Sequence, residues 1–338
     1  MKTVLITGAG GYIGCRLVEY LQNKGYKIKA LDRFFFGKER LQSVIKNPQV
    51  ELIEEDVRFF DPEILKDVEV VIDLSALSND PAGDLDPVKT WSINYLGRFR
   101  VATLAKVMGA TRYILPSSCS VYGFQEGIVS ETSAVNPLTT YAKANYKAEI
   151  DIKRLADKNY CTVILRFATV YGYSPRMRFD LAINGMVKGF FKNRKLPILR
   201  DGTQHRPFVH VMDICKAIHL SIEADEEKVN GEIFNVGSSE QNVQIFELAQ
   251  RVANTMGVEF KYEWYGLPDH RSYRVNFNKI KEVLNFHPDY TIEDGVKEIY
   301  EALKSGKLNP DDPTTITVEW YKKLISEGVM VWQGLSIS

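Results

Sequence analysis

The sequence has few of the residues that mark metal sites, disulfide frameworks or nucleic-acid binders. It contains four cysteines and five histidines in 338 residues, none at the spacing of a metal or redox motif. We therefore expect no bound metal, and we expect the cysteines to be reduced thiols that pack as small apolar groups. The 43 basic and 43 acidic side chains balance, so net charge favours neither nucleic acid nor an anionic membrane as a partner.

Long apolar runs are also absent, and no stretch is long enough to span a bilayer. The first residues read as a short strand, Thr3 to Ile6, rather than as a charged leader followed by an apolar segment. We expect a cytoplasmic protein with no membrane association. The length fits one large α/β domain with a smaller lobe.

A glycine-rich turn, T-G-A-G-G-Y-I-G at residues 7–14, joins an apolar strand to an amphipathic helix. Gly8 can adopt backbone angles closed to other residues, Gly11 lets the chain approach a pyrophosphate, and Gly14 lets the helix pack closely. The N-terminus of the helix offers free N–H groups and a positive dipole end to an anion. The turn therefore predicts a dinucleotide-binding unit.

Asp32 ends the next apolar strand, about 20 residues beyond the glycines, where an acid that binds the adenosine ribose is expected. A carboxylate accepts hydrogen bonds from both ribose hydroxyls and repels a 2′-phosphate, which favours NAD over NADP. The adjacent Arg33 keeps an NADP alternative open, since a guanidinium can pair with that phosphate. A solvated Asp-Arg pair in a turn is the other interpretation.

Apolar strands alternate with helical patterns through the first half of the chain, which predicts a Rossmann-type doubly wound parallel sheet. Beyond about residue 170, prolines punctuate shorter elements, as expected for a smaller C-terminal α/β lobe over the carboxyl ends of the strands. We expect residues 1–172, with 206–236 returning to them, to form the NAD-binding domain, and 173–205 with 237–330 the substrate-binding lobe. The further predicted strands are 50–53, 68–74, 113–115 and 161–165, and the predicted helices are 87–108 and 140–157.

Several segments together resemble the extended short-chain dehydrogenase/reductase family, and more narrowly its nucleotide-sugar epimerases and dehydratases. Besides the glycine turn, they are S-S-C-S-V-Y-G at 117–123, the helix that begins near Tyr141, L-R-F-A-T-V-Y-G at 165–172 and R-P-F-V-H-V-M-D at 206–213. The resemblance covers about residues 1–300, with the motifs in the family's order. It implies NAD as cofactor and a nucleotide-diphosphate sugar as substrate.

The resemblance also implies roles for individual residues. Ser118 matches the catalytic serine or threonine, and Tyr141 matches the catalytic base, with Asn145 beside it on the helix. The implied cofactor-binding residues are Gly8, Gly11, Tyr12, Ile13, Gly14, Asp32, Arg33, Asp56, Val57, Leu74, Ser75, Ala76, Asn94, Ser117, Tyr141 and Asn145. The implied substrate-binding residues are Ser118, Thr169, Asn184, Arg206 and Arg271.

Plainer interpretations stay open for some of these residues. Arg206 and Arg271 suit a diphosphate clamp, an interpretation favoured more for Arg206 because the local motif of Arg271 is shorter. The alternatives are a surface ion pair for Arg206 and a packing role in the small lobe for Arg271. Thr169 stands where many relatives place an asparagine. The positions after Ser118 hold Cys119 and Ser120 instead of the acid and base of the 4,6-dehydratases, which disfavours dehydration. Cys119 is interpreted as packing rather than as a reactive thiol.

Asn145 departs most from the family pattern, because the signature Tyr-x-x-x-Lys places a lysine there. That lysine lowers the pKa of the tyrosine so that a phenolate forms near neutrality, and asparagine supplies no such charge. Lys143 and Lys147 are two and six residues along the helix from Tyr141, so their side chains point away from the face that Tyr141 shares with Asn145. Three hypotheses follow: the nicotinamide's own charge acidifies Tyr141, the protein turns over little, or a recruited group replaces the lysine.

These observations predict oxidation at C4 of a nucleotide sugar by NAD, with Tyr141 as the base and Ser118 bonded to the same oxygen. A 4-epimerase and a 4-dehydrogenase both fit, and a non-catalytic NAD-binding sensor of the same fold is the alternative. Relatives that pair through the helices holding Asn94 and Tyr141 imply a homodimer.

Overall fold

A seven-stranded parallel sheet forms the centre of the molecule, in a computed structural model that describes residues 1–267 and 272–329. The chain runs outward from β1 to one edge through β2 and β3, then returns to the other side of β1 through β4, β5, β7 and β11. This reversal next to β1 is the topological switch point where such sheets bind ligands. The predicted Rossmann-type fold is confirmed. The strands are β1 (Thr3–Thr7), β2 (Lys27–Asp32), β3 (Val50–Glu54), β4 (Val70–Asp73), β5 (Arg112–Ser118), β7 (Cys161–Phe167) and β11 (Glu232–Val236).

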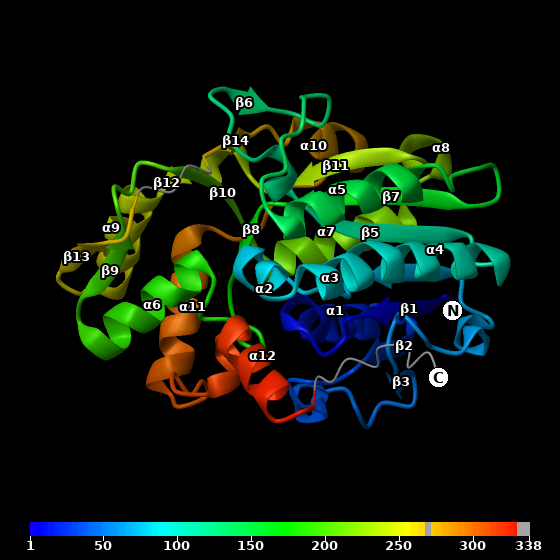
Figure 1. Cartoon of the computed structure of the whole chain (residues 1–338), viewed down its shortest axis with the longest axis horizontal. Helices are drawn as coiled ribbons and strands as arrows, with labels where there is room; N and C mark the ends of the chain where they lie inside the picture. Colours follow the sequence, from blue (N-terminus) through cyan, green and yellow to red (C-terminus); the bar gives the residue numbers. More distant parts are fainter. Residues whose placement is uncertain (268–271, 330–338) are drawn as a thin grey trace.

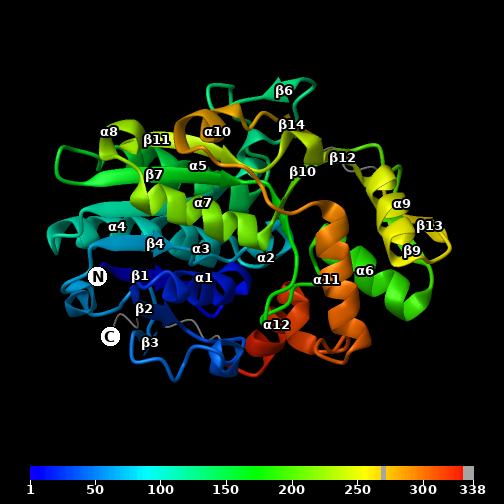
Figure 2. The same cartoon turned by 180° about the vertical axis from the view of Figure 1, so that it is seen from behind.

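Helices cover both faces of the sheet because its strands are apolar on both sides. Leu5 packs with α4 (Arg98–Val107) and α5 (Thr140–Lys153), whereas its neighbours Val4 and Ile6 pack with α1 (Tyr12–Asn23) and α7 (Val211–Glu223). Figure 1 shows α4 and α5 in front of the sheet, and Figure 2 shows α1 and α7 in front from behind.

A second, smaller group of elements lies beyond the carboxyl ends of the strands, at one end of the sheet (Figure 1). It has its own apolar core, built mainly from α6, α9 and α11 with β9. The elements are α6 (Ala182–Asn193), β9 (Leu196–Leu199), α9 (Ile245–Met256), β13 (Tyr262–Tyr265), α11 (Ile292–Lys304) and α12 (Thr317–Ser326).

Short strands connect the two groups. Strand β10 lies between β8, to which it is parallel, and β12, to which it is antiparallel. The connecting strands are β6 (Ile128–Val129), β8 (Thr169–Tyr171), β10 (His205–His210), β12 (Asn242–Gln244) and β14 (Arg274–Val275). Two short helices, α8 (Glu226–Val229) and α10 (Asn278–Leu284), pack instead against β11 at the edge of the large sheet. Because β8 directly follows β7, residues at the end of β7 border both groups.

The helix predicted over 87–108 is continuous but not uniformly α-helical. It consists of α3 (Pro87–Thr90), a π-helical turn (Trp91–Gly97) and α4, preceded by the short α2 (Asp80–Leu85). The π-turn holds Asn94, and π-turns often accompany functional sites. The helix predicted to reach residue 157 ends at Lys153. No helix among the described residues is long and apolar enough to cross a membrane.

Candidate functional site

The glycine turn lies so close to the sheet that side chains are excluded. A Cβ atom on Gly14 would stand 2.2 Å from the carbonyl oxygen of Gly8, and one on Gly8 would stand 2.8 Å from the backbone of Leu74. Gly8 also has a φ of +68°, which disfavours other residues. Gly11 caps α1, so the N-terminus of this helix opens onto the crevice between β1 and β4 and can bind a phosphate there.

Asp32 lies at the end of β2, with its carboxylate against the same turn. It accepts hydrogen bonds from the backbone N–H of Gly10 (3.0 Å) and of Phe34 (2.7 Å). Burial raises the pKa of this carboxyl group, and the two backbone donors oppose that rise. Arg33 faces the same space, with its guanidinium 5.4 Å from the centre of the Phe35 ring. Asp32 and the cation that could favour NADP, Arg33, therefore face the same space.

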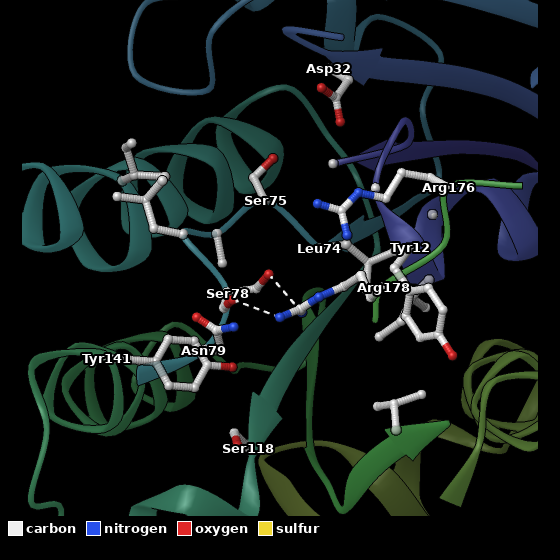
Figure 3. A pocket seen from close by; sticks show the side chains of 18 of the residues that line it. Tyr12, Asp32, Leu74, Ser75, Ser78, Asn79, Ser118, Tyr141, Arg176 and Arg178 are labelled. Carbon is white, nitrogen blue, oxygen red and sulfur yellow. Dashed lines mark hydrogen bonds between the residues drawn. The ribbon is translucent and has the colours of Figure 1, made fainter. Parts of the chain in front are cut away.

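A cavity of about 540 Å³ extends from Asp32 at one end to Ser118 and Tyr141 at the other (Figure 3). A second cavity, of about 290 Å³, shares Thr169 and Arg206 with it and extends towards the small lobe. The predicted site residues that line the larger cavity are Gly8, Gly11, Tyr12, Ile13, Gly14, Asp32, Arg33, Asp56, Val57, Leu74, Ser75, Ala76, Ser117, Ser118, Tyr141, Thr169 and Arg206.

Ser118 and Tyr141 reach this cavity from different elements. Ser118 is the last residue of β5, and its hydroxyl oxygen accepts a bond from the N–H of Ser120 (3.1 Å). Tyr141 lies in the first turn of α5, which Thr139 caps through the N–H of Ala142 (3.2 Å). Gly83 of α2 lies against it, because a Cβ there would be 2.9 Å from the Cβ of Tyr141. Figure 3 shows both side chains at the same end of the cavity.

The phenol of Tyr141 is in a mixed electrostatic environment. Burial raises its pKa above the ordinary value, and the nearby Asp80 carboxylate adds to the rise. Arg98 is the strongest influence in the other direction, and the polar groups of Ser118 and Asn145 also lower the pKa. The net direction is upward, so the site needs further positive charge, such as a bound cation supplies, before a phenolate dominates at neutral pH.

A buried ion pair supports the end of β5. Arg166 donates three hydrogen bonds to Glu149, of 2.6, 3.0 and 3.2 Å, and both side chains are almost fully buried. The hydroxyl of Ser117 donates to the same carboxylate (2.5 Å). Because Glu149 lies on α5, Ser117 on β5 and Arg166 on β7, this network joins the two elements that carry Ser118 and Tyr141 to the neighbouring strand.

Three predicted asparagines do not line the cavity, because other parts of the protein use their amides. Asn94 donates to the carbonyl of Leu77 (3.1 Å) and accepts from its N–H (2.8 Å). Asn184 bonds to the hydroxyl of Tyr12 (3.2 Å) and to two backbone groups, so it is a buried cross-link rather than a substrate contact. Asn145 of α5 accepts a hydrogen bond from Arg98 of α4 (2.6 Å) and is 1% exposed. The predicted Arg271 lies outside the described residues.

Two arginines that the sequence analysis did not select line the cavity. Arg176 is buried over the Phe36 ring, 3.7 Å from its centre, and burial lowers its pKa to about 10. Its Nε and Nη1 groups have no hydrogen-bond partner within the described part of the chain, so they are available to an anion or a ribose. Arg178 forms an ion pair with Asp180 (2.9 Å) and bonds to Ser78 (Figure 3). The sequence feature that could have pointed to these two arginines is the basic segment P-R-M-R at residues 175–178.

The cysteines take no part in the site. All four are buried and unpaired. The thiol of Cys119, directly after Ser118, lies 3.3 Å from the carbonyl oxygen of Arg166, and burial raises its pKa strongly. A thiol that stays protonated is a poor nucleophile, which agrees with the predicted packing role.

Comparisons with known proteins agree with this geometry. The family described as "NAD dependent epimerase/dehydratase family" matches residues 4–237. UDP-glucuronic acid decarboxylase 1 of Arabidopsis thaliana is 29% identical, over 91% of this chain and 71% of the relative. A putative UDP-glucose 4-epimerase of Methanocaldococcus jannaschii is 28% identical, over 89% of this chain and 98% of the relative.

Solved structures show the same fold with the cofactor bound. The UDP-glucuronic acid 4-epimerase of Bacillus cereus, in complex with UDP-glucuronic acid and NAD, superposes with a TM-score of 0.81 at 26% identity, over 90% of this chain and 99% of that one. MoeE5 with UDP-glucuronic acid and NAD gives a TM-score of 0.80, also at 26% identity, over 90% and 99%. The family is NAD-dependent and these structures hold NAD, so NAD is the cofactor.

Asp32 provides a test of how the protein selects its cofactor. We expect Asp32→Asn to weaken NAD binding by roughly tenfold, because a charged acceptor at the ribose is lost. The same change is expected to reduce the preference for NAD over NADP, because Arg33 remains to pair with the 2′-phosphate of NADP. Calorimetric titration with both cofactors measures the two effects. Arg33→Ala is the control and should leave NAD affinity within a few-fold; unchanged NAD binding in Asp32→Asn would contradict the assignment.

Proposed function

Because the chain belongs to the NAD-dependent epimerase/dehydratase family, we propose that it oxidises C4 of a UDP-sugar, as a 4-epimerase or a 4-dehydrogenase. The observation that carries the proposal is the convergence of Tyr141, Ser118 and the glycine turn on one cavity. UDP is the nucleotide in the names of the relatives from Arabidopsis and Methanocaldococcus.

In this proposal Tyr141 removes the proton of the sugar hydroxyl and Ser118 donates a hydrogen bond to the same oxygen. NAD, when bound, supplies the acceptor for the hydride that leaves C4. The Glu149–Arg166 ion pair keeps Ser118 in register with Tyr141 through Ser117. A 4-epimerase then returns hydride to the opposite face of the 4-keto sugar, whereas a 4-dehydrogenase releases the ketone.

The remaining substrate contacts follow from the shape of the two cavities. Arg206 and Thr169 line both, so they border the passage from the reacting end towards the small lobe. We assign the diphosphate to Arg206, whose planar group suits phosphate oxygens, and retain Arg271 as its proposed partner. Within residues 1–267 and 272–329, the Nε and Nη1 groups of Arg176 have no hydrogen-bond partner, and we assign them to the cofactor. The domain boundaries predicted above stay part of this proposal.

Dehydration is not the reaction that these residues support. Elimination of water needs an acid and a base beside the reacting carbons, and positions 119 and 120 hold a buried cysteine and a serine. The alternative of a non-catalytic NAD-binding sensor has two observations in its favour, namely Asn145 in place of the usual lysine and the raised pKa of Tyr141. A sensor, however, has no use for a serine and a tyrosine that converge on the cofactor cavity.

The reaction is tested by incubating the purified, NAD-loaded protein with UDP-glucose, UDP-glucuronic acid and their 4-epimers. We expect conversion of at least one of them. A product of unchanged mass at a new retention time identifies an epimerase, and loss of two hydrogens with reduction of the cofactor identifies a dehydrogenase. Loss of carbon dioxide from the glucuronate would replace the proposal with a decarboxylase, and no conversion with cofactor unreduced by every sugar would favour the sensor.

The role of Tyr141 is tested by removing its hydroxyl group. Tyr141→Phe should lower kcat by roughly 10²- to 10⁴-fold, the usual contribution of a positioned base, with NAD affinity retained. Ser118→Ala should lower it less. Tyr146→Phe, five residues further along the same helix, is the matched control and should keep full activity. The role fails if Tyr141→Phe turns over like this control.

We also propose that the protein is a homodimer formed through the helices around Asn94 and Tyr141. Apolar side chains along residues 87–108 are unusually exposed, with Val88 at 59%, Leu96 at 56% and Val107 at 74%. Light scattering should give twice the mass of the 38.5 kDa chain, and Leu96→Glu should shift it towards the monomer because it places a charge in an apolar interface. A single-chain mass for the wild type would refute the dimer.

A further inference from the structure

The active-site tyrosine of this protein lacks the lysine that normally accompanies it, and neither neighbouring lysine replaces it. Lys143 is exposed on α5, and Lys147 forms an ion pair with Asp151 (2.8 Å) on the solvent side of the same helix. Both observations agree with the orientation expected from helix geometry. A positive charge for Tyr141 must therefore come from another element.

Arg98, the first residue of α4, lies on the opposite side of Asn145 from the turn that holds Tyr141. Its Nη1 group donates to the Oδ1 atom of Asn145 (2.6 Å), and its Nε group donates to the carbonyl oxygen of Ser75 in the cavity wall (2.9 Å). Asn145 in turn donates through Nδ2 to the carbonyl oxygen of Tyr141 (3.0 Å). Arg98 is only 3% exposed, so little solvent screens its charge.

We propose that Arg98 is the recruited cation, a positioning residue that acts on Tyr141 across Asn145 and replaces the missing lysine. The proposal rests on the proposed oxidation at C4. In that step the hydroxyl proton passes to the Tyr141 phenolate and the hydride passes from C4 to NAD. C4 thereby becomes a ketone, NAD becomes NADH and the phenolate becomes a neutral phenol. A nearby positive charge favours the phenolate with which the step begins.

The other charged groups around Tyr141 are less suited to this role. Asp80 of α2 opposes ionisation. Arg178 is paired with Asp180 at 2.9 Å, and Lys89 of α3 lies 3.7 Å from Asp86, so carboxylates offset both cations. Arg176 lies at the other end of the cavity, over Phe36.

Arg98 differs from these cations in the character of its partners. Both of its side-chain acceptors are uncharged oxygens, and within residues 1–267 and 272–329 no carboxylate forms an ion pair with it. A buried guanidinium without a carboxylate partner is costly, and a phenolate on Tyr141 would lower that cost. Arg98 is also the strongest influence that lowers the pKa of Tyr141.

Asn145 is part of the same arrangement. A lysine at this position would face the Arg98 guanidinium and lose the bond that the amide oxygen accepts, so the two cations would repel each other. An asparagine instead accepts from the arginine and donates to the helix backbone. The departure from the family pattern at Asn145 is therefore compatible with catalysis because the charge has moved from α5 to α4.

The test compares Arg98→Gln, which keeps hydrogen-bond donors but removes the charge, with Arg98→Lys, Arg98→Met and the double variant Arg98→Met/Asn145→Lys. Arg100→Met, two residues along α4, is the matched control. Two quantities are measured on the NAD-loaded proteins. One is the pH dependence of cofactor reduction by the substrate; the other is the titration of Tyr141 from the ultraviolet difference spectrum against a matched Tyr141→Phe protein, which needs no substrate.

In Arg98→Gln and Arg98→Met we expect the pKa of Tyr141 to rise by about one unit and the acid limb of the rate profile to move upward with it. This corresponds to a roughly tenfold slower rate at neutral pH that recovers in alkali. Arg98→Lys and the double variant should regain most of the neutral rate, because each restores a cation. The control should follow the wild type.

A purely structural Arg98 would give a different result. The neutral variants would then lose rate equally at every pH, and the titration of Tyr141 would not move, which overturns the proposal. If Arg98→Met does not fold, Arg98→Gln and Arg98→Lys still decide the question, since they differ in charge while both keep a donor. If no UDP-sugar reacts with the wild type, the proposed reaction fails, but the titration still shows whether Arg98 sets the pKa of Tyr141.

Discussion

The close approach of the glycine turn to the ends of β1 and β4 is the constraint on which the rest of the site depends. With Gly14 against Gly8, and Gly8 against the backbone at Leu74, α1 begins where the sheet reverses direction. The N-terminus of this helix and the carboxyl ends of the strands therefore face one crevice. One backbone packing arrangement thus decides where a phosphate binds and which strand ends can carry functional side chains.

Buried polar contacts then hold the side chains around that crevice in place. Arg166 and Glu149 join β7 to α5 beneath Ser117, and Arg98 joins α4 to the wall at Ser75 and to Asn145 on α5. Each buried polar group needs partners in fixed geometry, because an unpaired one is costly. The network therefore restricts α4, α5, β5 and β7 to one relative arrangement, the arrangement that brings Ser118 and Tyr141 together. Electrostatic tuning and mechanical support come from the same contacts.

Local sequence was a good guide where a function depends on backbone geometry. The glycine turn, Asp32 at a strand end and Ser118 at another all line the predicted cavity, because strand and helix periodicity fixes where such residues stand. It was a poorer guide to side-chain partners. Asn184 was selected as a substrate contact and is instead a buried cross-link, and Arg98, Arg176 and Arg178 were not selected at all. Nothing in the local pattern around Arg98 distinguishes it from a cation on a solvated surface, and the basic segment at 175–178 is a weak signal for Arg176 and Arg178.

The sequence by itself determined the doubly wound sheet and the position of the cofactor turn, because these follow from local periodicity and short motifs. Its resemblance to a known family pointed to Ser118 and Tyr141 as the proposed catalytic pair. Only the tertiary structure decided how the charge that is missing at Asn145 is supplied. Arg98 and Asn145 are 47 residues apart in the chain, yet they form a 2.6 Å hydrogen bond. Such a contact depends on how α4 and α5 pack against the sheet, and no short stretch of sequence contains that information.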